Sequence, residues 1–117
     1  MPLIIYCIET LKSVKLNKEG IMEKVIETIN KFNQDRNWGS YHTPENIAKS
    51  ISIEAAELLE CFQWRQPKNL KAVEEELADV LIYSVIMAQR LDLDLETIML
   101  DKIEKNGQKY PVNKDER

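Results

Sequence analysis

Glycine and proline are scarce in this chain and stand at the borders of its apolar segments. The 117 residues contain three glycines and four prolines, about half the share expected from an average usage of ~7 % glycine and ~5 % proline. All but Pro2 border a segment of helical periodicity: Gly20, Gly39, Pro44, Pro67, Gly107 and Pro111. Because these residue types end helices more often than they interrupt them, the sequence predicts a few long helices.

Four segments between these borders repeat their apolar residues at helical spacing, and they cover residues 20–35, 43–62, 69–91 and 95–106. Thr43 followed by Pro44 is typical of a helix start, with an N-cap and a proline in the first turn, and Asp94 can cap the last helix. Signals for β-hairpins are weak. The predicted fold class is all-α, a four-helix bundle.

The third predicted helix differs from the others because its second half, Val80 to Ala88, is apolar on all sides. A helix without a polar face is normally buried, so we expect it at the centre of the bundle. A bundle this small has more apolar surface than one protomer can cover. We therefore expect a homodimer or homotetramer.

Length, cysteine content and charge restrict the class of protein. One domain is expected, at residues 20–113, between an N-terminal segment of unassigned structure at 1–19 and a tail at 114–117. No apolar run approaches the ~18 residues that span a bilayer, which predicts no membrane partner. Two cysteines without a CxxC pair fit a reducing compartment, so the expected location is cytoplasmic. A net charge of −4 without a basic block argues against nucleic-acid binding.

Two pairs of acidic residues flank the apolar stripes of consecutive helices. Glu54 and Glu57 are spaced i, i+3 on the second helix, and Glu76 and Asp79 repeat that spacing on the third. Either pair alone would favour an ordinary solvated face, since glutamate is a good helix former. Antiparallel packing would bring both pairs face to face, and four facing carboxylates suit Mg²⁺ or Mn²⁺ better than Zn²⁺. A di-iron bundle would need Glu-x-x-His motifs, and the chain has one histidine, His42.

The sequence allows two interpretations of several other polar and aromatic residues. Lys102 and Asn106 fall on the apolar face of the fourth helix, where a lysine is more often a snorkelling stem than a phosphate ligand. Trp38 and Trp64 stand in predicted loops at helix ends, either as core filling or as rings that stack on a ligand.

These residues resemble a known family over about residues 30–113. The motifs that carry the resemblance are Trp38-x-x-Tyr41-His42-Thr43-Pro44, Glu54-Ala55-Ala56-Glu57 through Phe62-Gln63-Trp64, Glu75-Glu76-Leu77-Ala78-Asp79, and Lys102-x-x-x-Asn106-x-x-Lys109-Tyr110-Pro111. In this order they are similar to the MazG-like all-α nucleoside triphosphate pyrophosphohydrolases, near the branch that contains the dCTP pyrophosphatases.

The resemblance implies a Mg²⁺-dependent enzyme that cleaves a (d)NTP, with dCTP or a modified dCTP expected, to the monophosphate and pyrophosphate. It places metal ligands at Glu54, Glu57, Glu76 and Asp79. Glu54 would orient or deprotonate the attacking water, and Lys102 would stabilise the leaving group. The residues implied in substrate binding are Trp38, His42, Trp64, Lys102, Asn106, Lys109 and Tyr110.

Two alternatives stay open at this level. One is a relative that acts on another pyrophosphate substrate, such as phosphoribosyl-ATP. The other is a helical nucleotide-binding or oligomerisation module without turnover, which the intact set of four carboxylates disfavours.

Overall fold

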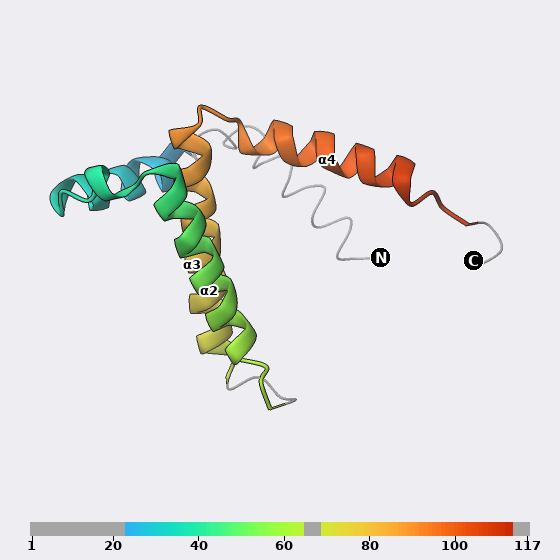
Figure 1. The fold of residues 1–117 in the computed structure, drawn as a ribbon, viewed down its shortest axis with the longest axis horizontal. Helices are drawn as coiled ribbons and strands as arrows, with labels where there is room; N and C mark the ends of the chain where they lie inside the picture. The colour runs from blue at the N-terminus through green and yellow to red at the C-terminus, as the bar shows by residue number, and fades with distance from the viewer. Residues whose placement is uncertain (1–22, 65–68, 114–117) are drawn as a thin grey trace. The chain divides into compact units, whose positions relative to one another are not determined.

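The computed structural model describes residues 23–64 and 69–113, and within these residues its regular elements are helical (Figure 1). The predicted all-α class is therefore confirmed. The chain divides into two compact units between Tyr41 and His42, which we describe separately. The expectations for residues 1–19 and 114–117 lie outside the described part of the chain.

The first unit contains a helix over residues 23–35 and a short 3-10 turn, η1 (Gly39–Tyr41). Within this helix Ile29 is buried, whereas Val25 and Phe32 are exposed by 41 % and 45 %. The helix ends because Asn37 adopts a left-handed φ of 56°. This reversal lets the Asn37 and Trp38 amides donate to the carbonyls of Gln34 and Asn33, at 3.1 and 3.0 Å, the pattern of a Schellman C-cap.

The second unit is built on a pair of antiparallel helices, α2 (Pro44–Glu60) and α3 (Leu70–Arg90), which lie side by side (Figure 1). Thr43 caps α2 as predicted, and its hydroxyl accepts a hydrogen bond from the Asn46 amide at 3.2 Å. Asn69 caps α3 in the same way, accepting from Ala72 at 2.7 Å. These caps use N–H groups that would otherwise lack a partner in the first turn.

The core of this unit is small and consists of the following buried side chains: Ile47, Cys61, Val85, Ile86 and Ala88. The prediction that the second half of α3, Val80 to Ala88, is buried on all sides is wrong for the described residues of a single chain. Within that segment, Leu81 and Ile82 are exposed by 57 % and 39 %. Among the described residues, α2 packs against α3 but does not enclose it.

The last helix, α4 (Leu95–Lys109), has no buried residue. It follows a second Schellman-type turn, in which Asp92 has a φ of 53° and the Leu93 amide donates to the Ala88 carbonyl at 2.8 Å. Asp94 stands at the N-cap position, but it makes no capping bond to the backbone. The helix also continues through Gly107, where the sequence predicted its end. No helix in the described residues is long and apolar enough to cross a membrane.

Candidate metal centre

Three carboxylates from the facing sides of α2 and α3 meet at one point. Glu54, Glu76 and Asp79 each offer an oxygen, and these oxygens all lie within 4.8 Å of one another. All three residues are partly buried. The i, i+3 spacing places Glu76 and Asp79 on the same side of α3, and the antiparallel packing brings that side to Glu54. The cluster is thus made by one residue of α2 and two residues of α3.

Two oxygens of this cluster lack the partners that a buried polar atom normally has. Oε2 of Glu54 and Oε2 of Glu76 are inaccessible to solvent and accept no hydrogen bond. A buried carboxylate oxygen without a partner is costly, so such an atom calls for an explanation such as an ion. The orphaned oxygens and the all-carboxylate donor set fit a hard divalent cation.

The electrostatics of the cluster lead to the same conclusion. Burial, a hydrogen bond with Glu57 and the nearby acidic charges raise the pKa of Glu54 from 4.5 to about 7. The pKa of Glu76 is also raised, chiefly by its hydrogen bond with Glu57 and then by burial. Negative charges at this spacing disfavour one another unless a proton or a cation lies among them.

Glu57, the fourth acid of the predicted set, is partly buried. It raises the pKa of both Glu54 and Glu76. Its oxygens do not belong to the group within 4.8 Å, which consists of Glu54, Glu76 and Asp79. On α2 it is one turn beyond Glu54, and its carbonyl accepts a weak hydrogen bond from the Cys61 thiol at 3.6 Å.

His42 lies just before the N-cap of α2, and its ring meets the Tyr83 ring edge to face at 6.4 Å. Tyr83 is one turn beyond Asp79 on α3, so His42 is near the end of the acidic face. Burial and the positive charge of Arg90 lower the pKa of His42. The imidazole is therefore neutral at physiological pH, which suits it to hydrogen bonding rather than to charge pairing.

The other predicted binding residues of this unit are exposed. Trp64 follows α2 and is 82 % exposed. Lys102, Asn106 and Lys109 are exposed along α4, and Tyr110 after it is 68 % exposed. The Lys109 ammonium lies 5.3 Å from the centre of the Tyr110 ring. The acidic cluster itself involves α2 and α3.

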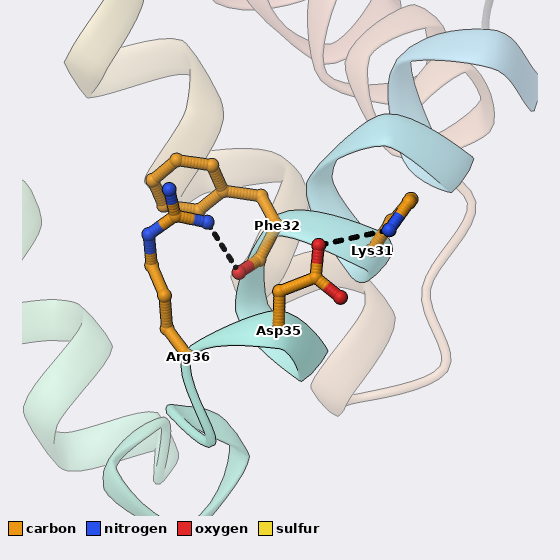
Figure 2. Close-up of polar contacts among 4 residues, drawn as sticks. All are labelled: Lys31, Phe32, Asp35 and Arg36. Carbon is orange, nitrogen blue, oxygen red and sulfur yellow. Dashed lines mark hydrogen bonds and ion pairs between the residues drawn. The ribbon is translucent and has the colours of Figure 1, made fainter.

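Trp38, the remaining predicted binding residue, belongs to the first unit and is 40 % exposed. Its ring meets the Phe32 ring at 5.5 Å and 70°. The Arg36 guanidinium lies 3.5 Å above the centre of the same Phe32 ring, as Figure 2 shows. The sequence pattern indicates Phe32 only as part of the apolar stripe of the first helix and gives no role to Arg36. The signal that could have found them is an aromatic pair six residues apart across a helix end, the spacing of a Schellman contact.

The comparisons with known proteins connect this geometry to a family. A sequence profile of the MazG-like family matches residues 49–117. dCTP pyrophosphatase 1 of Rattus norvegicus is 36 % identical over an alignment of 105 residues that covers 81 % of this chain and 62 % of the rat protein. dCTP pyrophosphatase 1 of Homo sapiens is 33 % identical over 105 residues, with the same two shares of 81 % and 62 %. The chain thus spans a little under two thirds of the length of these relatives.

A solved structure shares the fold. A crystal structure of a pyrophosphatase from Archaeoglobus fulgidus superposes with a TM-score of 0.73 at 41 % identity, over 78 % of this chain and 93 % of the archaeal chain. The matched profile includes both acidic pairs and covers more than half of the sequence. This chain belongs to the MazG-like family.

Proposed function

We propose that this protein is a Mg²⁺-dependent nucleoside triphosphate pyrophosphohydrolase. It cleaves a (d)NTP between the α- and β-phosphates and releases the monophosphate and pyrophosphate, with dCTP or a modified dCTP as the preferred substrate. The observation that carries the proposal is the carboxylate cluster, with its two orphaned oxygens on Glu54 and Glu76. The names of the relatives, dCTP pyrophosphatase and pyrophosphatase, support the reaction class.

Glu54, Glu57, Glu76 and Asp79 hold the cation in this proposal, and Mn²⁺ is the second candidate for the site. When bound, the cation neutralises phosphate charge and makes water a better nucleophile. Glu54 orients the attacking water and accepts its proton. Its pKa in the metal-free chain is raised first by burial and then by Glu57 and the other nearby acidic charges, and a bound cation would offset these effects.

The remaining roles in the proposal belong to side chains outside the cluster. Lys102 stabilises the negative charge that accumulates on the pyrophosphate leaving group, with Lys109 as a second cation. Trp38 and Trp64 stack on the base. The polar groups that contact the nucleotide are His42, Asn106 and Tyr110.

The test is a panel of nucleotides incubated with the protein and Mg²⁺, with the products separated by anion-exchange chromatography. The expected products are a monophosphate and pyrophosphate. Release of a diphosphate and inorganic phosphate refutes the assigned bond. Glu57→Gln should abolish turnover, whereas Glu74→Gln, an exposed position on the same helix as Glu76, should leave it unchanged. Nucleotide binding without any product would favour the non-catalytic alternative.

The protein also forms a homodimer or homotetramer in this proposal. The argument is the apolar surface that one chain leaves exposed on α2 and α3: Ile53, Leu59, Leu77, Leu81 and Ile82. Exposed apolar area of this kind is normally an interaction surface. Light scattering coupled to size-exclusion chromatography tests this, and a monomer at micromolar concentration would contradict it.

A further inference from the structure

We propose that Phe32 and Arg36 are positioning residues that hold the Trp38 indole ready for a nucleobase. The inference rests on the proposed function, in which Trp38 stacks on the base, and adds two residues to it. It concerns residues 32–38, at the end of the helix of the first unit, and Figure 2 shows Phe32 and Arg36 of this segment.

The backbone conformation fixes the position of the Trp38 Cα. Asn37 takes the left-handed conformation at φ 56°, and this turns the chain back toward the helix that it has just left. The Trp38 amide then donates to the Asn33 carbonyl at 3.0 Å, and the Asn37 amide donates to the Gln34 carbonyl at 3.1 Å. With both bonds made, the Cα of Trp38 is held over the last turn of the helix.

The Phe32 ring then fixes the side chain of Trp38. The two ring centres lie 5.5 Å apart with the planes at 70°, which is a favourable edge-to-face geometry. The ring pair occupies the place of the apolar contact that usually accompanies a Schellman turn.

Arg36 in turn restrains Phe32. Its guanidinium lies 3.5 Å from the centre of the Phe32 ring, within the range of a cation–π contact. The same guanidinium donates through Nη1 to the Phe32 carbonyl at 3.0 Å, so it is tied to both the ring and the backbone of one residue. Phe32 thus contacts both of the other side chains: the Arg36 guanidinium lies over its ring, and the Trp38 indole meets that ring edge to face.

Core packing does not explain this arrangement of Phe32, Arg36 and Trp38. Phe32 and Trp38 are exposed by 45 % and 40 %, so neither ring is enclosed by the described residues. Exposing two large apolar rings to water is unfavourable in free energy. A flat ligand that stacks on the rings would cover this exposed surface. A restrained ring loses little conformational entropy when a base stacks on it, and this lowers the free-energy cost of binding.

The experiment measures KM and kcat for dCTP with Mg²⁺. Phe32→Leu removes the ring but keeps an apolar side chain, and we expect KM to rise roughly fivefold with kcat within about twofold. Phe32→Tyr keeps the ring and should retain the wild-type KM. Arg36→Gln should raise KM by roughly twofold to threefold, because it removes the charge above the ring.

Lys31→Ala is the matched control. Lys31 lies on the same helix and pairs with Asp35 at 2.8 Å (Figure 2), and both side chains are exposed. Its KM should equal that of the wild type. An unchanged KM in both Phe32→Leu and Arg36→Gln overturns the inference, and so does a loss confined to kcat. Circular dichroism and melting curves check that each variant folds.

A spectroscopic readout separates failure of this inference from failure of the proposed function. In a Trp64→Phe background the emission reports Trp38 alone, since the chain has two tryptophans. Phe32→Leu should shift that emission to longer wavelength and lower its anisotropy, whether or not the protein hydrolyses nucleotides. A wild-type chain inactive on every nucleotide refutes the proposed function. An unchanged Trp38 emission in Phe32→Leu refutes the positioning role.

Discussion

Replacing Glu54 with glutamine should stabilise the metal-free protein at alkaline pH, although it removes a predicted metal ligand. The pKa of Glu54 rises from 4.5 to about 7 in the folded chain, because of burial and its acidic neighbours. That difference corresponds to about 3.5 kcal/mol at most, since one pKa unit is worth about 1.4 kcal/mol. Glu54 is partly exposed, and solvent screening reduces the expected gain to about 1–2 kcal/mol.

The sign of the pH dependence follows from the direction of the shift. A carboxyl group whose folded pKa is above its unfolded value favours folding below pH 4.5, and this contribution is lost as the pH rises through about 7. Metal-free wild type should therefore lose stability between pH 5 and pH 8, roughly the window between the two pKa values. Glutamine does not titrate, so Glu54→Gln should show a flatter profile over this window.

The assay is urea unfolding in EDTA at pH 5 and pH 8, at fixed protein concentration, followed by far-ultraviolet circular dichroism. Millimolar Mg²⁺ should raise the melting temperature of the wild type, and should raise that of the variant much less. Glu74→Gln is the control for removing a charge from an exposed helix position. If Glu54→Gln is no more stable than the wild type in EDTA at pH 8, the argument from charge crowding is wrong.

Substitutions at four further positions test the local structure, each by comparison of urea midpoints with the wild type. Thr43→Ala should cost about 1 kcal/mol because it removes the bond to the Asn46 amide, whereas Asp94→Ala should cost less than half of that, since Asp94 makes no capping bond. Gly107→Ala should stabilise the protein by about 0.5–1 kcal/mol, because Gly107 lies inside α4 and an added Cβ would meet nothing within 4 Å. Asn37→Ala should cost about 1 kcal/mol at its φ of 56°, and Asn37→Gly should be neutral or stabilising.

Local signals in the sequence accounted for most of the helices. Thr43 and Pro44 marked the start of α2 because a side-chain acceptor and a fixed φ act within a few residues. The same reasoning was wrong at Gly107, where the helix continues to Lys109. A glycine permits a helix end but does not require one, and here the capping interactions form later, with the Tyr110 amide donating to the Asn106 carbonyl at 2.8 Å.

Burial was harder to predict than secondary structure. The run from Val80 to Ala88 was expected to be covered on all sides, yet Leu81 is 57 % exposed in the single chain. The hydropathy of a helix indicates how much surface must be covered, but not whether its own chain or another one covers it. That distinction depends on how many helices pack around α3, which no local pattern contains.

The sequence by itself determined the helical class, the N-cap of α2, and the i, i+3 acidic pairs, because each depends on residues a few positions apart. Only the tertiary structure decided that Glu54, Glu76 and Asp79 each bring an oxygen within 4.8 Å of the others, and that one oxygen each of Glu54 and Glu76 is buried without a partner. The registration of α2 against α3 sets these distances, and it results from the packing of many side chains at once. The raised pKa of Glu54 has the same origin, because burial and neighbouring charge exist only once the two helices have packed.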